Sequence, residues 1–137
     1  MQKRSVIANL TTMSRAVFLS GFIAAAGLAS QSAQALEGLA LAKASGCTAC
    51  HSVPTKIVGP AWQDVANKYK GKTEITAVLT NGKEVKGAPL EVLQQKIAQG
   101  GKGNWTAVTG GVPMPANSPR VSAADVEKLA KFILSLS

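Results

Sequence analysis

The segment Cys47-Thr48-Ala49-Cys50-His51 (CTACH) places two thiols and an imidazole within five consecutive residues. In a C-x-x-C-H pattern the thiols can form thioethers with the two vinyl groups of one haem, and the histidine that follows can coordinate the iron. Only thiols add readily to vinyl groups, and neutral imidazole is a good ligand for haem iron. The segment therefore predicts one covalently bound haem c, held by Cys47, Cys50 and His51.

The same cysteine spacing is also found in thioredoxin-like redox pairs and in zinc sites. A redox pair requires a strand-and-helix α/β context, which the sequence does not show. A zinc site requires further ligands, yet Cys47 and Cys50 are the only cysteines and His51 is the only histidine, so carboxylates would have to complete it. Haem attachment is the favoured interpretation, and zinc and dithiol chemistry are the alternatives.

The N-terminus has the layout of a secretory signal peptide. Basic residues, an uncharged apolar run and a small-residue ending follow one another: Lys3, Arg4 and Arg15, then residues 16–29, then Ala33-Gln34-Ala35. The run of 14 apolar residues is shorter than the roughly 20 that a membrane-spanning helix needs. We predict that residues 1–35 are a cleaved signal peptide, that residues 36–137 form the only domain, and that the protein is periplasmic without a permanent membrane anchor.

One methionine lies in a loop between two prolines. After removal of residues 1–35, Met114 is the only methionine left, and Pro113 and Pro115 flank it. A methionine that fills a core gap is more often found on the apolar stripe of a helix. The prolines restrict the backbone and would hold the thioether toward the iron. Met114 is the predicted second axial ligand, and simple packing is the alternative.

The predicted domain is moderately basic. Its 102 residues hold 12 Lys and Arg against 7 Asp and Glu, a formal charge of +5. The lysines are scattered, and an exported chain rarely meets nucleic acid, so we expect no nucleic-acid partner. A solvated surface and attraction to an acidic protein partner both remain open.

The spacing of apolar residues predicts about four short helices separated by long loops. The expected helices are residues 36–45, a helix carrying Trp62, Val65, Ala66 and Tyr69 that ends at Gly71, a helix from Pro89 to Gly100-Gly101, and a C-terminal helix capped by Ser122 and Asp125. Residues 72–88 contain Asn81-Gly82, a strong hairpin-turn dipeptide, and predict a small β-hairpin. A small all-α domain with long loops needs a disulfide, a metal or a cofactor to supplement its core, and a large apolar cofactor would supply the missing interior.

Five pieces of the sequence resemble the small bacterial class I cytochromes c, specifically the c-551 type. In order they are GCTACH, VGPAWQDVANKY, GKGNW, VPMPAN and LAKFILS, and the match covers nearly all of residues 37–137. The resemblance implies the class I cytochrome c fold wrapped around one haem. Two features depart from the family pattern: residues 72–88 are extra relative to the shortest members, and Trp105 lies nine positions before Met114, farther than in the compact pattern.

The resemblance also implies roles for residues around the haem. The Pro60 carbonyl would accept a hydrogen bond from His51, Trp105 would hydrogen-bond a haem propionate, and Asn117 would lie by the Met114 sulfur. Phe132 would pack where the first and last helices cross. The alternatives are that Trp105 is an ordinary core residue and that Asn117 only shapes a turn.

The haem predicts single-electron transfer and not enzymatic catalysis. An electron carrier performs no bond chemistry, and the sequence accordingly shows no arrangement of a catalytic acid, base or nucleophile. The expected partners are redox proteins: quinol–cytochrome c reductase-type donors and terminal oxidase or nitrite reductase-type acceptors. We expect the protein to be a monomer. Four lysines could steer docking onto acidic surfaces: Lys56, Lys83, Lys86 and Lys102. The alternatives are a haem subunit of a redox enzyme (a peroxidase or a sulfur-oxidising complex) and a haem-based sensor.

Overall fold

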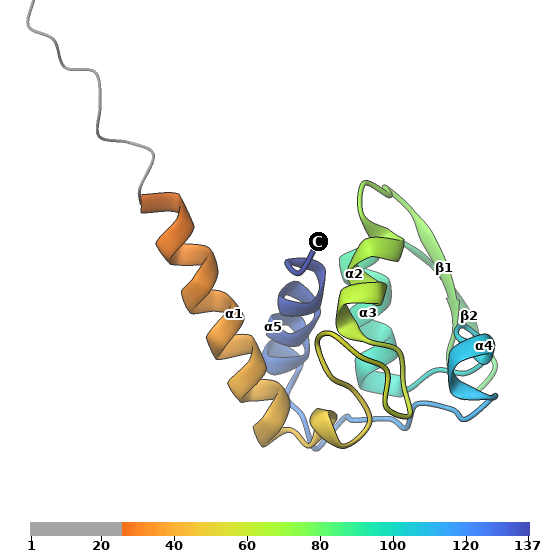
Figure 1. Ribbon diagram of the computed structural model, residues 1–137. Helices are drawn as coiled ribbons and strands as arrows, with labels where there is room; N and C mark the ends of the chain where they lie inside the picture. Colours follow the sequence, from red (N-terminus) through yellow and green to blue (C-terminus); the bar gives the residue numbers. More distant parts are fainter. Residues whose placement is uncertain (1–25) are drawn as a thin grey trace, which may run out of the picture.

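The computed structural model describes residues 26–137, so most of the predicted signal peptide lies outside the described residues. The chain forms five α-helices, one short 3-10 turn and one two-stranded sheet within this range (Figure 1). The elements are α1 (Ala26–Ala44), η1 (Cys47–Ala49), α2 (Trp62–Tyr69), β1 (Ile75–Val78), β2 (Glu84–Gly87), α3 (Pro89–Gln99), α4 (Thr106–Thr109) and α5 (Ala123–Leu134). None of the described helices is long and apolar enough to cross a membrane.

Helix α5 is the centre of the fold because it contacts α1, α2 and α3 (Figure 1). It begins where the sequence predicted, since the Ser122 hydroxyl oxygen accepts a hydrogen bond from the backbone N–H of Asp125 at 3.1 Å. This bond satisfies one of the free N–H groups of the first turn. The buried side of the helix carries Val126, Leu129, Ala130, Phe132 and Ile133.

The crossing of α1 and α5 depends on small residues. Gly38 lies against the Phe132 ring, and a β-carbon at position 38 would overlap that ring. Ala42 is buried on the same side of α1, whereas Leu36 is 70% exposed. Close approach to α5 therefore selects small residues of α1 for the inner face and leaves Leu36 outside it. The helix also starts earlier than the predicted 36–45.

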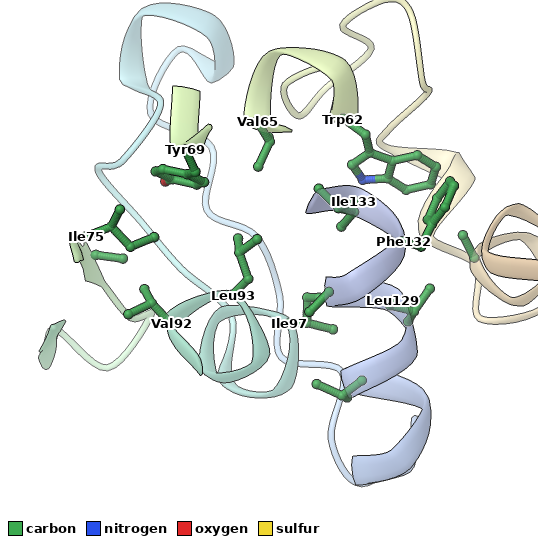
Figure 2. Close-up of a cluster of buried hydrophobic side chains, with 14 of the residues drawn as sticks. Trp62, Val65, Tyr69, Ile75, Val92, Leu93, Ile97, Leu129, Phe132 and Ile133 are labelled. Carbon is green, nitrogen blue, oxygen red and sulfur yellow. The ribbon is translucent and has the colours of Figure 1, made fainter. Parts of the chain in front are cut away.

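Helices α2, α3 and α5 enclose the apolar core (Figure 2). The side chains that meet there are Trp62, Val65 and Tyr69 of α2, Val92, Leu93 and Ile97 of α3, and Leu129 and Ile133 of α5. The Trp62 and Phe132 rings pack edge to face with centroids 5.6 Å apart. Several of these core side chains also line the cavity described below: Trp62, Val65, Leu93, Ile97, Leu129 and Ile133.

The predicted hairpin is present. Strands β1 and β2 pair antiparallel, with Ile75 opposite Gly87 and Val78 opposite Glu84. Gly82 has a φ of 87°, which only glycine adopts readily, and this explains the position of the turn. The inward side chains are buried against α3: Ile75, Ala77, Leu79 and Val85.

Residues 100–119 form the predicted long loop, but they also contain α4, which the sequence did not predict. The helix has only four residues, and the Trp105 carbonyl accepts hydrogen bonds from the N–H groups of Val108 and Thr109. A single turn is too short for apolar periodicity to reveal.

Candidate haem site

The chain encloses a cavity of about 300 Å³. Cys47, Cys50, His51 and Met114 all line it, so the fold brings together the four residues that the sequence proposed as covalent and axial ligands. Much of the remaining wall is apolar, including Val65, Leu93, Ile97, Leu129 and Ile133. An apolar wall with a few convergent polar groups is typical of cofactor sites.

Cys47 and Cys50 lie on and directly after the 3-10 turn η1, and both are free thiols with intermediate burial. The loop that follows folds back, because the N–H groups of Val58 and Gly59 donate to the Cys50 carbonyl at 3.2 and 2.8 Å. This fold-back delivers Pro60 to His51. Burial raises the pKa of the Cys47 thiol, partly offset by the charge of Arg120.

The imidazole of His51 is held on two sides. Its Nδ1 atom lies 2.8 Å from the Pro60 carbonyl oxygen, and its ring stacks on Trp62 with centroids 5.8 Å apart and planes 12° apart. A carbonyl can only accept, so Nδ1 carries the proton. Burial lowers the pKa of His51, although the bond to Pro60 opposes this shift. The neutral ring therefore keeps an unprotonated Nε2, which is the form that binds iron.

Met114 is fixed through its backbone. Its N–H donates to the Gly101 carbonyl at 2.8 Å, and its own carbonyl accepts from the Gly101 N–H at 3.0 Å. The Thr80 hydroxyl donates to the same Met114 carbonyl at 3.0 Å. The side chain is half-buried in the cavity wall. Sequence reasoning identified Met114 but missed Gly101 and Thr80, because nothing in their local pattern indicates contact with a loop so distant along the chain.

The other two predicted site residues, Trp105 and Asn117, differ in position. Trp105 lines the cavity, and the Lys68 ammonium lies 4.2 Å from its ring centroid. Asn117 is buried outside the lining: its Nδ2 donates to the Ile97 carbonyl at 2.9 Å, and its Oδ1 accepts from Arg120 at 2.6 Å. The predicted contact of Asn117 with the Met114 sulfur stays a prediction.

Comparison with known proteins identifies the family. A family model of cytochrome c matches residues 35–137. The chain belongs to the cytochrome c family. The cytochrome c-551 of Allochromatium vinosum is 45% identical over 102 residues, which are 74% of this chain and 88% of that protein. The cytochrome c-551 of Pseudomonas aeruginosa is 38% identical over 117 residues, which are 85% of this chain and 93% of that protein.

A solved structure supports the same assignment. The crystal structure of wild-type Nitrosomonas europaea cytochrome c552 superposes with a TM-score of 0.56 at 39% identity, covering 72% of this chain and 99% of that one. The predicted c-551 type, fold class and covalent haem c are confirmed by these matches. The protein is an electron-transfer protein, as its c-551 relatives are.

Lys96 is a residue of the cytochrome site that sequence reasoning missed. It lines the cavity and is 9% exposed, and no carboxylate of residues 26–137 pairs with it. Burial lowers its pKa to about 8, and the charge of Lys68 adds to the effect. The sequence spacing could have indicated that Lys96 is buried, because position 96 falls on the apolar face of α3 with Leu93 and Ile97. A buried cation without a partner is costly unless a ligand supplies the opposite charge.

Proposed function

We propose that this cytochrome is a periplasmic carrier of single electrons whose haem iron is coordinated by His51 and Met114. The observation that carries the proposal is the convergence of both side chains, with Cys47 and Cys50, on one apolar cavity. When bound, haem supplies an iron centre that gains and loses one electron. The chain's own residues would attach the haem covalently, coordinate its iron and exclude water from it.

The two proposed axial ligands affect the haem iron in different ways. The Pro60 carbonyl orients the His51 ring and increases its basicity through the 2.8 Å hydrogen bond. The Met114 thioether favours the reduced state and raises the reduction potential, and it closes the iron to exchangeable ligands. A carrier needs both properties, because side reactions with small molecules would divert electrons.

One corner of the cavity is suited to the haem carboxylates. Lys96 and Trp105 both line the wall, and Lys68 lies close enough to each to interact with it. Together they offer two cations and an indole N–H donor, which also lies within hydrogen-bonding reach of the Tyr69 hydroxyl. We propose that Lys96 and Trp105 bind haem carboxylates, which would supply the charge that Lys96 lacks within the chain.

An apolar rim marks where partners would dock. Val58 and Val112 line the cavity and are 43% and 53% exposed, and the neighbouring Ile57 is 51% exposed. Exposed apolar residues at the mouth of a redox site suit the small, transient interfaces of electron-transfer complexes. We propose this rim as the contact for reductase-type donors and for terminal oxidase or nitrite reductase-type acceptors.

Four lysines were proposed to steer docking, and their surroundings differ. Lys102 lines the cavity, and Lys56 precedes the exposed Ile57. Lys86 forms an ion pair with Glu74 at 2.8 Å, which offsets its charge. We propose that Lys56 and Lys102 attract acidic partners more strongly than Lys86 does, with Lys83 in the exposed turn as a further contributor.

Carbon monoxide separates the carrier from the alternatives. An iron closed by His51 and Met114 should bind carbon monoxide poorly in the reduced protein at neutral pH. A peroxidase, a sulfur-oxidising subunit or a gas sensor needs an open or exchangeable iron position. Rapid and complete carbon monoxide binding by the reduced wild-type protein would therefore reject the carrier proposal.

A further inference from the structure

We propose that the β1–β2 hairpin is a brace for the Met114 loop, acting through Thr80 and Asn104 as positioning residues. The proposal rests on the proposed function, in which Met114 is an iron ligand. It assigns a role to residues 72–88, the segment that is extra relative to the shortest members of the family.

The first connection is direct. Thr80 lies two residues after β1, and its hydroxyl donates to the Met114 carbonyl. With the two Gly101 bonds, three hydrogen bonds hold the N–H and the carbonyl of Met114. The packing is tight, because a β-carbon at Gly100 would overlap the Met114 carbonyl oxygen and lie 2.5 Å from Thr80 Oγ1. The loop therefore has no room to slide along the end of the hairpin.

The second connection runs through Asn104. Its Nδ2 donates to the Val78 carbonyl and to the Lys102 carbonyl, each at 2.8 Å, and its Oδ1 accepts from the Val78 N–H at 2.9 Å. The Lys102 N–H also donates to the Val78 carbonyl at 3.1 Å. These bonds attach residues 101–104 to the end of β1. Gly101 is in turn joined to Met114 by two backbone hydrogen bonds.

The hairpin can serve as a brace because it is anchored in the core. Leu79, between Val78 and Thr80, is completely buried, and Ala77 is 1% exposed. Ala77 lies on β1, which packs against α3, and Leu79 directly follows that strand. A loop gains conformational freedom with length, and nine positions separate Trp105 from Met114. The extra hairpin thus restrains a ligand loop that is itself longer than the compact pattern.

Two variants and two matched controls test the brace in the haem-loaded protein. Thr80→Val and Asn104→Ala each remove side-chain hydrogen bonds to or near the Met114 loop. Thr76→Val changes an exposed residue of β1, and Asn67→Ala changes an exposed residue of α2. If Asn104→Ala is not recovered, Thr80→Val alone decides, because it removes only an exposed hydroxyl.

The first measurement is hydrogen exchange of the Met114 and Gly101 amides by NMR. We expect exchange about threefold to tenfold faster in Thr80→Val, the effect of losing one net hydrogen bond, and at least as large an effect in Asn104→Ala, which loses three hydrogen bonds. The controls should match the wild type. If the two variants exchange at control rates, the brace is wrong whatever ligand the iron has.

The second measurement is the affinity of the oxidised protein for added imidazole, which must displace Met114. We expect about threefold to tenfold tighter binding in the two variants than in the controls. Unchanged imidazole affinity in a protein that shows the iron–methionine absorption band would overturn the brace as a device for ligation. If the wild type lacks that band while loop exchange still rises in the variants, the ligation proposal fails and the structural brace stands.

Discussion

Gly59 lies so close to the imidazole ring of His51 that a β-carbon at position 59 would overlap the ring. The contact explains why the loop can turn back to Cys50 and still present Pro60 to Nδ1. The ligand histidine is therefore positioned by a hydrogen bond, a stacked indole and the absence of one side chain.

Gly59→Ala should displace the His51 ring. We expect the free energy of unfolding of the haem-loaded protein to fall by about 1–3 kcal/mol, the usual cost of overpacking. Gly87→Ala is the matched control, because its β-carbon would meet the flexible end of Glu91 at 3.1 Å and make an ordinary contact with Val92 at 3.9 Å. Thermal and denaturant unfolding measure both variants. Equal stability of the two variants would show that the ring has room to shift without cost.

Lys96→Met should lower the reduction potential. A positive charge beside the cavity disfavours the oxidised iron, which carries one more positive charge than the reduced iron, so its removal favours oxidation. We expect a decrease on the order of tens of millivolts. Lys43→Met, an exposed change on α1, should leave the potential unchanged. Redox titration of both variants checks this, and an unaltered potential in Lys96→Met would place the ammonium group away from the haem.

Lys56→Gln and Lys102→Gln together should slow electron transfer to an acidic redox partner by about threefold at low ionic strength and flatten the salt dependence. Lys86→Gln should have a smaller effect because Glu74 already offsets the Lys86 charge. Stopped-flow rates across a range of salt concentrations make the comparison. The steering proposal fails if all three charges can be removed without changing the slope.

Processing of the N-terminus is testable by mass spectrometry of the exported protein. We expect the mature chain to begin at Leu36, with the haem attached. In the uncleaved chain, α1 runs continuously through the predicted cleavage position. Recovery of a chain that retains residues 1–35 from the periplasm would contradict the signal-peptide prediction.

The sequence was sufficient for the parts of the fold that have a local cause. Periodic apolar residues indicated α2, α3 and α5, and Asn81-Gly82 indicated the hairpin turn. The inner face of α1 was not predictable in this way, because the close approach of Gly38 to Phe132 decides it and hydrophobicity does not.

In the candidate site, too, the residues in local motifs could be predicted from the sequence, whereas those that depend on distant contacts could not. The proposed ligands belong to short motifs and could be named from the sequence, as could the Pro60 carbonyl through the family resemblance. Thr80, Gly101 and Asn104 reach Met114 or β1 only after the chain has folded, so their roles depend on contacts between segments distant in sequence. The position of Lys96 on the apolar face of α3 can be read from the sequence, but its place on the cavity wall depends on the fold.

The absorption spectrum of the oxidised protein tests the axial ligation most directly. We predict that the wild type shows the weak long-wavelength band of an iron–methionine bond and that Met114→Ala loses it while keeping its covalent haem. A wild type without this band, or a Met114→Ala variant that retains it, would contradict the account.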